Sequence, residues 1–399
     1  QLLGAAKEKV PKVPSPTASS SKTFVRPESP PKAKKIKRTT TPLSPHQSKY
    51  PFHGLMYPRN DVLSHPASKE LLKYAIEGCP VDCGANWTLE HIETAIQRGA
   101  HPSARAPKAA KACREEALAR VKEKCCRLVD WETLKREGIP PNLKVSPIAA
   151  IPHKSRLFCM ILDLAFDIRV NGELLGSVND SSNKSLAPAH SMFELGNVIP
   201  RIVWVLAKAD PNLPFLISKI DLKDGYWRMC VSKENAWNFA YVLLLPKLSK
   251  EEPPQLVVPD ALQMGWSESP AFFCAATETA RDVAMKNIQN KASLEPHPLE
   301  SIMLGDANFD FLPNTYQNRP TEFIKLLEVY IDDFIGVIQA KSVKELRQFT
   351  RAVLHAIYNT FPPPEVTGST MGPPISVSYT HLRAHETEAD LVCRLLLEK

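Results

Sequence analysis

Residues 328–340 read EVYIDDFIGVIQA and place two adjacent carboxylates, Asp332 and Asp333, between two apolar runs. β-Branched and aromatic residues on both sides of a polar pair predict two short strands joined by a tight turn that carries the aspartates. Like charges side by side repel each other, and a divalent cation would remove that repulsion. Because Mg²⁺ prefers one or two carboxylates with waters and phosphates, the hairpin is typical of half a metal site for phosphoryl chemistry. For the pair taken alone, a solvated turn without a ligand is the alternative.

Two upstream stretches complete the pattern. Residues 215–229 read FLISKIDLKDGYWRM, an apolar strand that ends at Asp221 and is followed by a turn. Residues 262–273 read LQMGWSESPAFF, a glycine-containing loop in which Ser269 and Pro270 predict the start of a helix. In this order, the three stretches resemble motifs A, B and C of reverse transcriptases, with YIDD as the Tyr-x-Asp-Asp box. One block alone is a weak signal, whereas three in order with their flanking residues are specific.

This resemblance implies an RNA-directed DNA polymerase that adds deoxynucleotides to a primer 3′-end with two Mg²⁺ ions, or Mn²⁺ in their place. The implied catalytic and metal-binding residues are Asp221, Asp332 and Asp333, with the Leu222 carbonyl as a further ligand and with Tyr330 and Ile331 as the flank of motif C. The implied nucleotide-binding residues are Lys154, Arg156, Asp224, Gly225, Tyr226, Met264 and Gly265. The implied partners are an RNA template, a DNA primer or template, and dNTPs.

Three of these positions carry specific expectations. Tyr226 lies where the family has a bulky side chain that crowds a ribose 2′-hydroxyl and thereby selects deoxynucleotides; an ordinary core aromatic is the alternative. Gly265 would let the backbone approach a nucleotide closely. Met264 occupies a position that is Gln in retroviral relatives.

Residues 142–166 read NLKVSPIAAIPHKSRLFCMILDLAF and predict two apolar strands joined by a polar turn. They resemble the fingers hairpin of reverse transcriptases, whose basic residues neutralise charge on the transferring phosphate. Lys154 and Arg156 are the candidates. The chain departs from the family at Cys159, where a second Arg is expected, and a thiol cannot grip a phosphate in a bidentate way. A decayed, inactive element copy that at most binds nucleic acid is therefore the second hypothesis.

Helical periodicity fills much of the remainder. Thr88 is a candidate N-cap for a helix that ends at Gly99. Further helices are predicted at 108–124, 192–205 and 342–358, the last one amphipathic and covering the palm sheet. The segment 290–320, rich in Pro and Asn, is predicted to be a surface excursion.

Charge is concentrated at the N-terminus. The first 50 residues contain eleven Lys or Arg and two Glu, a net charge of +9, against +7 for the whole chain of 399 residues. Such a Pro-, Ser- and Lys-rich segment cannot bury enough apolar surface to offset its chain entropy and is predicted to be disordered. A nuclear-import signal, a phosphate-contacting arm and a solvated linker are open interpretations of its basic run at 31–38.

The C-terminal residues are interpreted as sequence that does not come from the protein's gene, with a genuine C-terminal amphipathic tail as the alternative. Residues 377–387, VSYTHLRAHET, match a translated frame of the mosaic-end and primer sequence used in transposase-based sequencing libraries, and 391–399 match the adapter that follows it. The predicted organisation is a disordered tail over 1–49, a helical lead-in over 50–143, reverse transcriptase fingers and palm over 144–368, a truncated end over 369–376, and an adapter-derived artefact over 377–399.

The sequence also disfavours several other classes of protein and of binding site. No apolar run is long enough to span a bilayer, and nine cysteines without a regular framework indicate a reducing, intracellular compartment, nuclear or cytoplasmic. The spacing of Cys79, Cys83, His91 and His101 matches no common zinc site. Viral RNA-dependent RNA polymerases usually place Gly before their Asp pair, where this chain has Ile331.

The predicted fold is α+β, with the fingers and palm of a right-hand polymerase and an antiparallel, ferredoxin-like palm sheet. The resemblance covers roughly residues 50–368 and is most specific over 144–340. It identifies the chain as a fragment of a retrotransposon polyprotein.

Overall fold

The computed structural model describes residues 56–153, 157–209, 216–244, 253–304, 323–340, 342–375 and 381–384. All of these lie within one compact unit, Gln47–Lys399. The predicted tail over 1–49, the candidates Lys154 and Arg156, and most of the adapter-like end lie outside the described residues. Within the described part, no helix is both long enough and apolar enough to cross a membrane.

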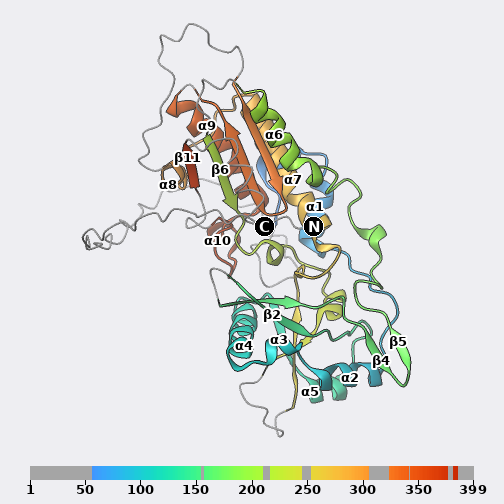
Figure 1. Cartoon of the computed structure of the whole chain (residues 1–399). Coiled ribbons are helices and arrows are strands. Elements are labelled where there is room, and N and C mark those ends of the chain that lie inside the picture. The colour runs from blue at the N-terminus through green and yellow to red at the C-terminus, as the bar shows by residue number, and fades with distance from the viewer. Residues whose placement is uncertain are drawn as a thin grey trace, which may run out of the picture. The chain divides into compact units, whose positions relative to one another are not determined.

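A four-stranded antiparallel sheet carries the two aspartate-containing stretches (Figure 1). Its strands, in spatial order, are β11 (His381–Ala384), β6 (Leu216–Asp221), β10 (Asp333–Ile338) and β9 (Lys325–Tyr330). Helix α7 (Ser269–Gln289) lies between β6 and β9 in the chain, and α9 (Val343–Thr360) follows β10. With β11 included, the β-α-β-β-α-β order with antiparallel neighbours is a ferredoxin-like connectivity. Strand β11 lies within 377–399, the stretch interpreted from the sequence as adapter-derived and outside the fold, so only β6, β9 and β10 belong to the part of the sheet that the sequence predicts.

The two faces of this sheet are covered differently because side chains alternate along each strand. Ile220, Phe334 and Leu327 belong to the main core, which includes α7 and α9. Ile335 and Val337 point to the opposite face, where they pack with Val198, Ile202 and Leu206 of α6 (Val198–Ala207). Asp333 is two residues from Ile335 and directly opposite Asp221, so the side chains of both aspartates lie on this second face.

Two of the helices around the sheet, α7 and α9, begin within a residue of where the sequence predicts. Helix α7 starts at Ser269 with Pro270 in its first turn, a position where proline loses no hydrogen bond. The Ser342 side chain caps α9 by accepting a hydrogen bond from the Glu345 N–H. The predicted helix at 192–205 begins later, at Val198, because turns and a 3₁₀ segment occupy the residues before it.

A second group of short sheets lies outside the ferredoxin-like unit. Strands β2 (Ile148–Pro152) and β3 (Phe158–Leu162) form the predicted antiparallel hairpin. Strand β8 (Gln255–Pro259) pairs with both β1 (Cys126–Asp130) and β7 (Tyr241–Val242). Strands β4 (Ile168–Val170) and β5 (Glu173–Leu175) form a small hairpin. The segment 50–143, predicted to be helical, thus also contains strand β1. This strand has only five residues, too few for a strand pattern to be recognised in the sequence.

Most of the lead-in is nevertheless helical. Its α-helices are α1 (Ser68–Glu77), α2 (Leu89–Arg98), α3 (Pro102–Arg105), α4 (Pro107–Lys122) and α5 (Trp131–Glu137). Thr88 caps α2 by accepting a hydrogen bond from the His91 N–H, as predicted. The described 3₁₀ segments are η1 (Asn60–Ser64), η2 (Lys184–Leu186), η3 (Leu195–Asn197), η4 (Gly225–Arg228) and η5 (Asn235–Phe239).

Helix α4 has the mixed surface predicted for 108–124. It buries Ala109, Cys113 and Ala117, while exposed Lys111 pairs with Glu115 one turn away at 3.9 Å.

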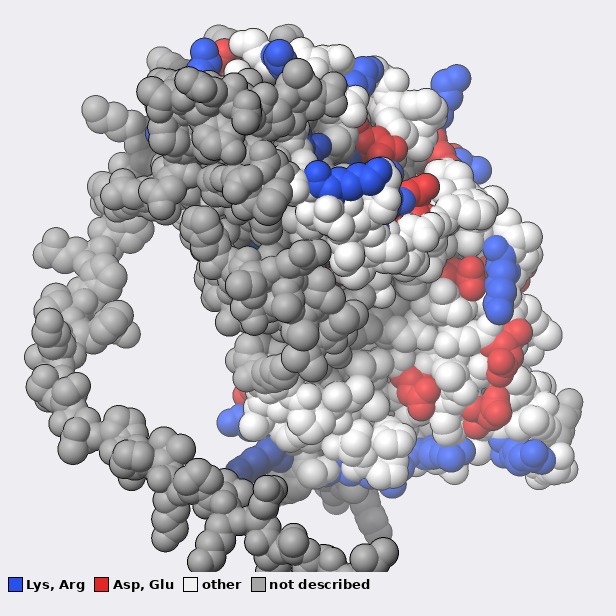
Figure 2. Space-filling view, turned by 45° about the horizontal axis from the view of Figure 1, so that its top comes forward, with Lys and Arg blue, Asp and Glu red and all other residues white. Residues whose placement is uncertain are grey.

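Figure 2 shows Lys and Arg along the lower edge of the molecular face in view, with Asp and Glu interspersed above them. Charge of one sign does not dominate that face.

The predicted surface excursion at 290–320 agrees with the exposed loop over 291–296 and is wrong for 297–304, while 305–320 lie outside the described residues. Helix α8 (Glu300–Leu304) packs on α9. The Glu300 side chain is buried, and both of its carboxylate oxygens pair with the Arg351 guanidinium. Apolar Leu294, Met303 and Leu304 drive this packing, which overrides the local turn signals. Beyond α9, α10 (Pro364–Thr367) is followed by Met371 and Ile375, which are both buried.

Gly336 in β10 provides a test of this packing. A Cβ at Gly336 would lie 2.9 Å from the Phe349 ring of α9 and 2.5 Å from the Ser218 hydroxyl. We expect Gly336→Ala to lower the free energy of unfolding by about 1–3 kcal/mol, because an overpacked core must shift. Chemical denaturation measures the change.

Gly196→Ala is the matched control, because a Cβ there meets no atom within 4 Å. Adding Phe349→Leu to Gly336→Ala should recover part of the loss. Equal stability of Gly336→Ala and the unmodified chain would contradict the packing of α9 on β10.

Candidate metal centre

Asp221, Asp332 and Asp333 converge at one end of the ferredoxin-like sheet. Asp221 is the last residue of β6, Asp333 is the first residue of β10, and Asp332 lies in the turn between β9 and β10. One carboxylate oxygen from each residue lies within 4.8 Å of the other two, a spacing that can hold a metal ion. The hairpin and the convergence agree with the sequence prediction.

Strand register brings these residues together. Asp333 is directly opposite Asp221 in the antiparallel pair of β10 with β6, so both side chains project from the same face. The Leu222 N–H then donates to the Asp332 carbonyl at 3.1 Å and holds the turn beside the end of β6. Two carboxylates opposite each other destabilise a sheet unless a cation balances them.

The pKa values of Asp221 and Asp332 reflect both their burial and this repulsion. Burial, and then the charges of Asp332 and Asp333, raise the pKa of Asp221 to about 7. Burial, and then the charge of Asp333, raise the pKa of Asp332 to about 6. Lys219 opposes both shifts, and its Nζ lies 2.9 Å from Asp333 Oδ2.

The three residues fit a divalent cation. Asp333 Oδ1 is buried and has no hydrogen-bond partner among the described residues, which leaves one acceptor of the site available for a cation. Hard oxygen donors are the ligands that Mg²⁺ and Mn²⁺ prefer. Within the described part of the chain, no other group of three or more His, Cys, Asp or Glu side chains has such a spacing.

The turn that presents Asp332 is strained. Ile331 has φ 58°, in the left-handed region, which is rarely occupied by a β-branched residue. Tyr330, the last residue of β9, is opposite Asp333 in register and packs partly against the α6 cluster. The motif C flank therefore connects the carboxylates to α6.

The motif A turn places Tyr226 beside the carboxylates. Asp224 adopts a left-handed conformation, φ 60° and ψ 28°, immediately before η4. Gly225 lies where a Cβ would come within 3.4 Å of the Phe273 ring and 3.8 Å of the Asp332 Cβ. The Tyr226 ring contacts Phe273 edge-on, with 5.2 Å between centroids, and burial raises the pKa of its hydroxyl.

In the motif B loop, Gly265 is required by the protein backbone itself. It has φ 111°, and a Cβ there would lie 2.1 Å from the Leu162 carbonyl oxygen of β3. Asn179 braces the same loop, because its side chain donates to the Gly265 carbonyl at 2.9 Å and accepts from the Ser267 N–H at 3.0 Å. Neighbouring Met264 is half-exposed.

Cys159 lies in β3 directly opposite Ile151 of β2. Strand alternation puts it on the same side as Ile161, whose Cγ2 lies 3.8 Å from the position of a Cβ on Gly265. The Cys159 position therefore belongs to the hairpin face next to the motif B loop. The other two fingers candidates, Lys154 and Arg156, lie outside the described residues.

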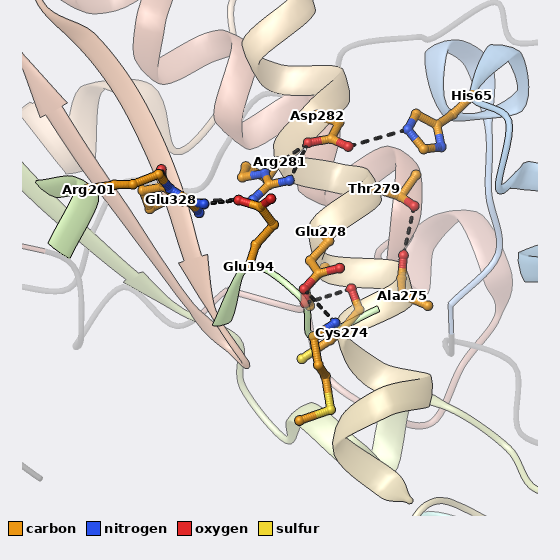
Figure 3. A network of polar contacts seen from close by, with 12 residues as sticks. His65, Glu194, Arg201, Cys274, Ala275, Glu278, Thr279, Arg281, Asp282 and Glu328 are labelled. Atoms are coloured by element: carbon orange, nitrogen blue, oxygen red, sulfur yellow. Dashed lines mark hydrogen bonds and ion pairs between the residues drawn. The ribbon is translucent and has the colours of Figure 1, made fainter. Parts of the chain in front are cut away.

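A polar network supports β9 near the carboxylates (Figure 3). The Glu328 side chain is only 4% exposed and receives two hydrogen bonds from Arg201 of α6, at 2.8 and 2.6 Å. Arg281 of α7 lies 3.8 Å from the same carboxylate, and Arg201 also pairs with Glu194. Two cations thus neutralise the buried charge four residues before Asp332.

Lys219 is the site residue that the sequence reasoning missed. It precedes Asp221 by two residues, so strand alternation alone puts its side chain on the same face. That signal was available in the sequence. Its contact with Asp333, however, depends on the pairing of β6 with β10.

Comparison with known proteins gives structural similarity without a match in sequence. No protein-family profile and no curated protein match the sequence. Among solved structures, the chain is similar to a foamy viral protease-reverse transcriptase in complex with double-stranded DNA, with a TM-score of 0.41 and 17% sequence identity. The match covers 76% of this chain and 35% of that protein, so this chain spans about a third of its length.

The raised pKa values predict a pH-dependent stability. Between the ordinary carboxyl pKa of 3.8 and the raised values of about 6 and about 7, the folded chain binds more protons than the unfolded chain. Unfolding then releases protons, so the metal-free chain loses stability as pH rises through this window. We expect its Tm to fall between pH 5 and pH 8 and Mg²⁺ to restore it mainly at pH 8.

Asp332→Asn should flatten this pH dependence and abolish the Mg²⁺ effect, because it removes one of the repelling charges and a ligand. Asp167→Asn, at an exposed aspartate outside the site, is the control and should leave both unchanged. Differential scanning calorimetry measures the Tm. A Tm that rises with pH in metal-free buffer would refute the electrostatics described above.

Proposed function

We propose that this chain contains the fingers and palm of an RNA-directed DNA polymerase from a retrotransposon polyprotein. The observation that carries the proposal is the convergence of Asp221, Asp332 and Asp333 on one face of a ferredoxin-like sheet. The three sequence motifs, in their order along the chain, support it independently. The reaction is the addition of deoxynucleotides to a primer 3′-end, directed by an RNA or DNA template.

Each motif residue has a role in this proposal. Asp221, Asp332 and Asp333 hold two Mg²⁺ ions, with the Leu222 carbonyl as a further ligand. When bound, the metals lower the pKa of the primer 3′-hydroxyl and neutralise charge on the triphosphate and the leaving pyrophosphate. The chain's own residues orient the nucleotide: those assigned to this role are Lys154, Arg156, Asp224, Gly225, Tyr226, Met264 and Gly265.

Tyr226 is assigned to sugar selection. Its ring is packed against Phe273 and adjoins the turn beside Asp332, so it has little freedom to move away from a bulkier sugar. A ribose 2′-hydroxyl would meet the ring, whereas a deoxyribose would not. The packing against Phe273 is also what an ordinary core aromatic would show, and substitution separates the two roles.

The test of the polymerase proposal separates metal binding from catalysis. Mn²⁺ titration followed by electron paramagnetic resonance measures binding without substrates, and primer extension on an RNA template measures incorporation. We expect Asp332→Asn to weaken Mn²⁺ binding and to lower incorporation by ~10²-fold or more. Asp167→Asn is the control for both measurements.

Two results would count against the proposal. One is Mn²⁺ binding that does not change in Asp332→Asn. The other is a folded, Mn²⁺-binding chain that does not extend primers on any template.

Cys159 favours a second candidate, a decayed element copy that binds nucleic acid without polymerising. A thiol there cannot supply the charge-assisted, two-pronged phosphate contact of an arginine. If that contact is missing, Cys159→Arg should raise nucleotide incorporation by about 10²-fold, the usual scale of one preorganised phosphate-stabilising group. Template affinity should change little, because the template is held through its own phosphates.

Leu174→Arg is the control for added charge, because Leu174 is an exposed apolar residue on the separate β4–β5 hairpin. Single-turnover primer extension at matched salt compares the two variants with the unmodified chain. Equal rates for Cys159→Arg and the unmodified chain would mean that the Cys159 position does not face the triphosphate.

A further inference from the structure

The motif A turn is held from outside by an arginine of the lead-in helix α4. Arg120 is 11% exposed, and its Nη2 lies 2.7 Å from Asp224 Oδ1. Its Nη1 lies 3.0 Å from Glu123 Oε2, and its guanidinium carbon lies 4.9 Å from the centre of the Trp227 ring. One side chain therefore contacts residues on both sides of Tyr226.

The contact with Asp224 fixes an unusual backbone conformation. Asp224 has φ 60°, in a region that is unfavourable for L-residues and that Asp tolerates better than most of them. The 3₁₀ segment η4 begins at the next residue, so the left-handed conformation of Asp224 sets the direction in which Tyr226 leaves the turn. A partly buried ion pair at that point opposes relaxation to a more common conformation.

Arg228 holds the two ends of the same turn. Its side chain is fully buried, and its Nε donates to the Lys223 carbonyl at 2.7 Å. Its Nη2 donates to the carbonyls of Gly372 and Pro373, both at 3.0 Å. With the ends fixed, the position of the middle of the turn depends on what contacts Asp224 and Trp227, and Arg120 contacts both.

We propose that Arg120 is a positioning residue for sugar selection, which acts through Asp224 and Trp227 to keep the Tyr226 ring against Phe273. This role rests on the proposed polymerase function and extends it to a residue about 100 positions before motif A. The ion pairs of Arg120 are with Asp224 and Glu123 and not with the three aspartates of the metal centre. Its loss loosens Tyr226 and admits ribonucleotides.

Arg120→Met tests the proposal, because it keeps an unbranched apolar side chain and removes the charge and the planar donors. We expect the preference for dNTP over rNTP to fall on the order of 10-fold, the scale of a small misplacement of a binding group. Tyr226→Ala, which removes the ring, should reduce it further. Adding Arg120→Met to Tyr226→Ala should cause no additional loss, since both act through the same ring.

Two controls isolate the turn. Arg127→Met removes an arginine with the same chemistry elsewhere, because Arg127 pairs with Asp260 at 2.8 Å and stacks on Trp237 at 4.7 Å. Glu123→Gln removes the other ion pair of Arg120 and leaves the Asp224 contact in place. Neither should change the dNTP-to-rNTP preference.

Amide hydrogen exchange provides a readout that needs no turnover. Exchange in the peptide 222–229 should rise in Arg120→Met and stay unchanged in Arg127→Met, while Mn²⁺ binding stays the same in both. Asp224→Asn is the second variant, in case Arg120→Met does not fold, and should reproduce the loss of selectivity.

The outcomes separate the two proposals. Active Arg120→Met and Asp224→Asn variants with unchanged nucleotide preference would overturn the positioning role and leave the polymerase intact. Variants that slow dNTP and rNTP incorporation equally would show that Arg120 is only structural. A folded, unmodified chain that binds Mn²⁺ and does not extend primers would instead overturn the proposed function, and the sugar-selection role with it.

Discussion

The pairing of Asp333 with Asp221 across β10 and β6 is the interaction on which the candidate site depends. Antiparallel register places the two carboxylates opposite each other on one face, and the hairpin turn adds Asp332. The apolar residues of the same strands support this repulsive arrangement, because their burial against α6, α7 and α9 fixes the register. A shift of one residue would move every one of those side chains to the wrong face.

Each of the three motifs contains a residue with positive φ at its turn. These residues are Asp224 at φ 60°, Gly265 at φ 111° and Ile331 at φ 58°. Only at Gly265 does the sequence use glycine, and there a side chain would collide with the Leu162 carbonyl. The strain at Asp224 and Ile331 is sustained by neighbours, such as the Arg120 ion pair and the Leu222 hydrogen bond to Asp332.

Arginines connect the motifs to the rest of the described chain. Arg201 and Arg281 neutralise Glu328 beneath the motif C hairpin, while Arg120 and Arg228 hold the motif A turn. Each contacts a segment far away in sequence, and most of these contacts are partly or wholly removed from water. Breaking one partner of such a pair leaves an uncompensated charge or carbonyl, so these side chains restrict how the motifs can move relative to the helices.

The sequence by itself determined the strands that carry the aspartates, the hairpin over 142–166, the turn at Asp332 and the cap at Thr88. These follow from local rules of periodicity, turn chemistry and capping, whereas the set of three carboxylates came from the resemblance of the motifs to a known family. Only the tertiary structure decided that α6 begins at Val198, that β1 joins β8, and that residues 297–304 pack on α9, because burial against distant partners overrides local signals. The Arg120 contact with Asp224 joins positions about 100 residues apart, and an ion pair between such positions leaves no local pattern in one sequence.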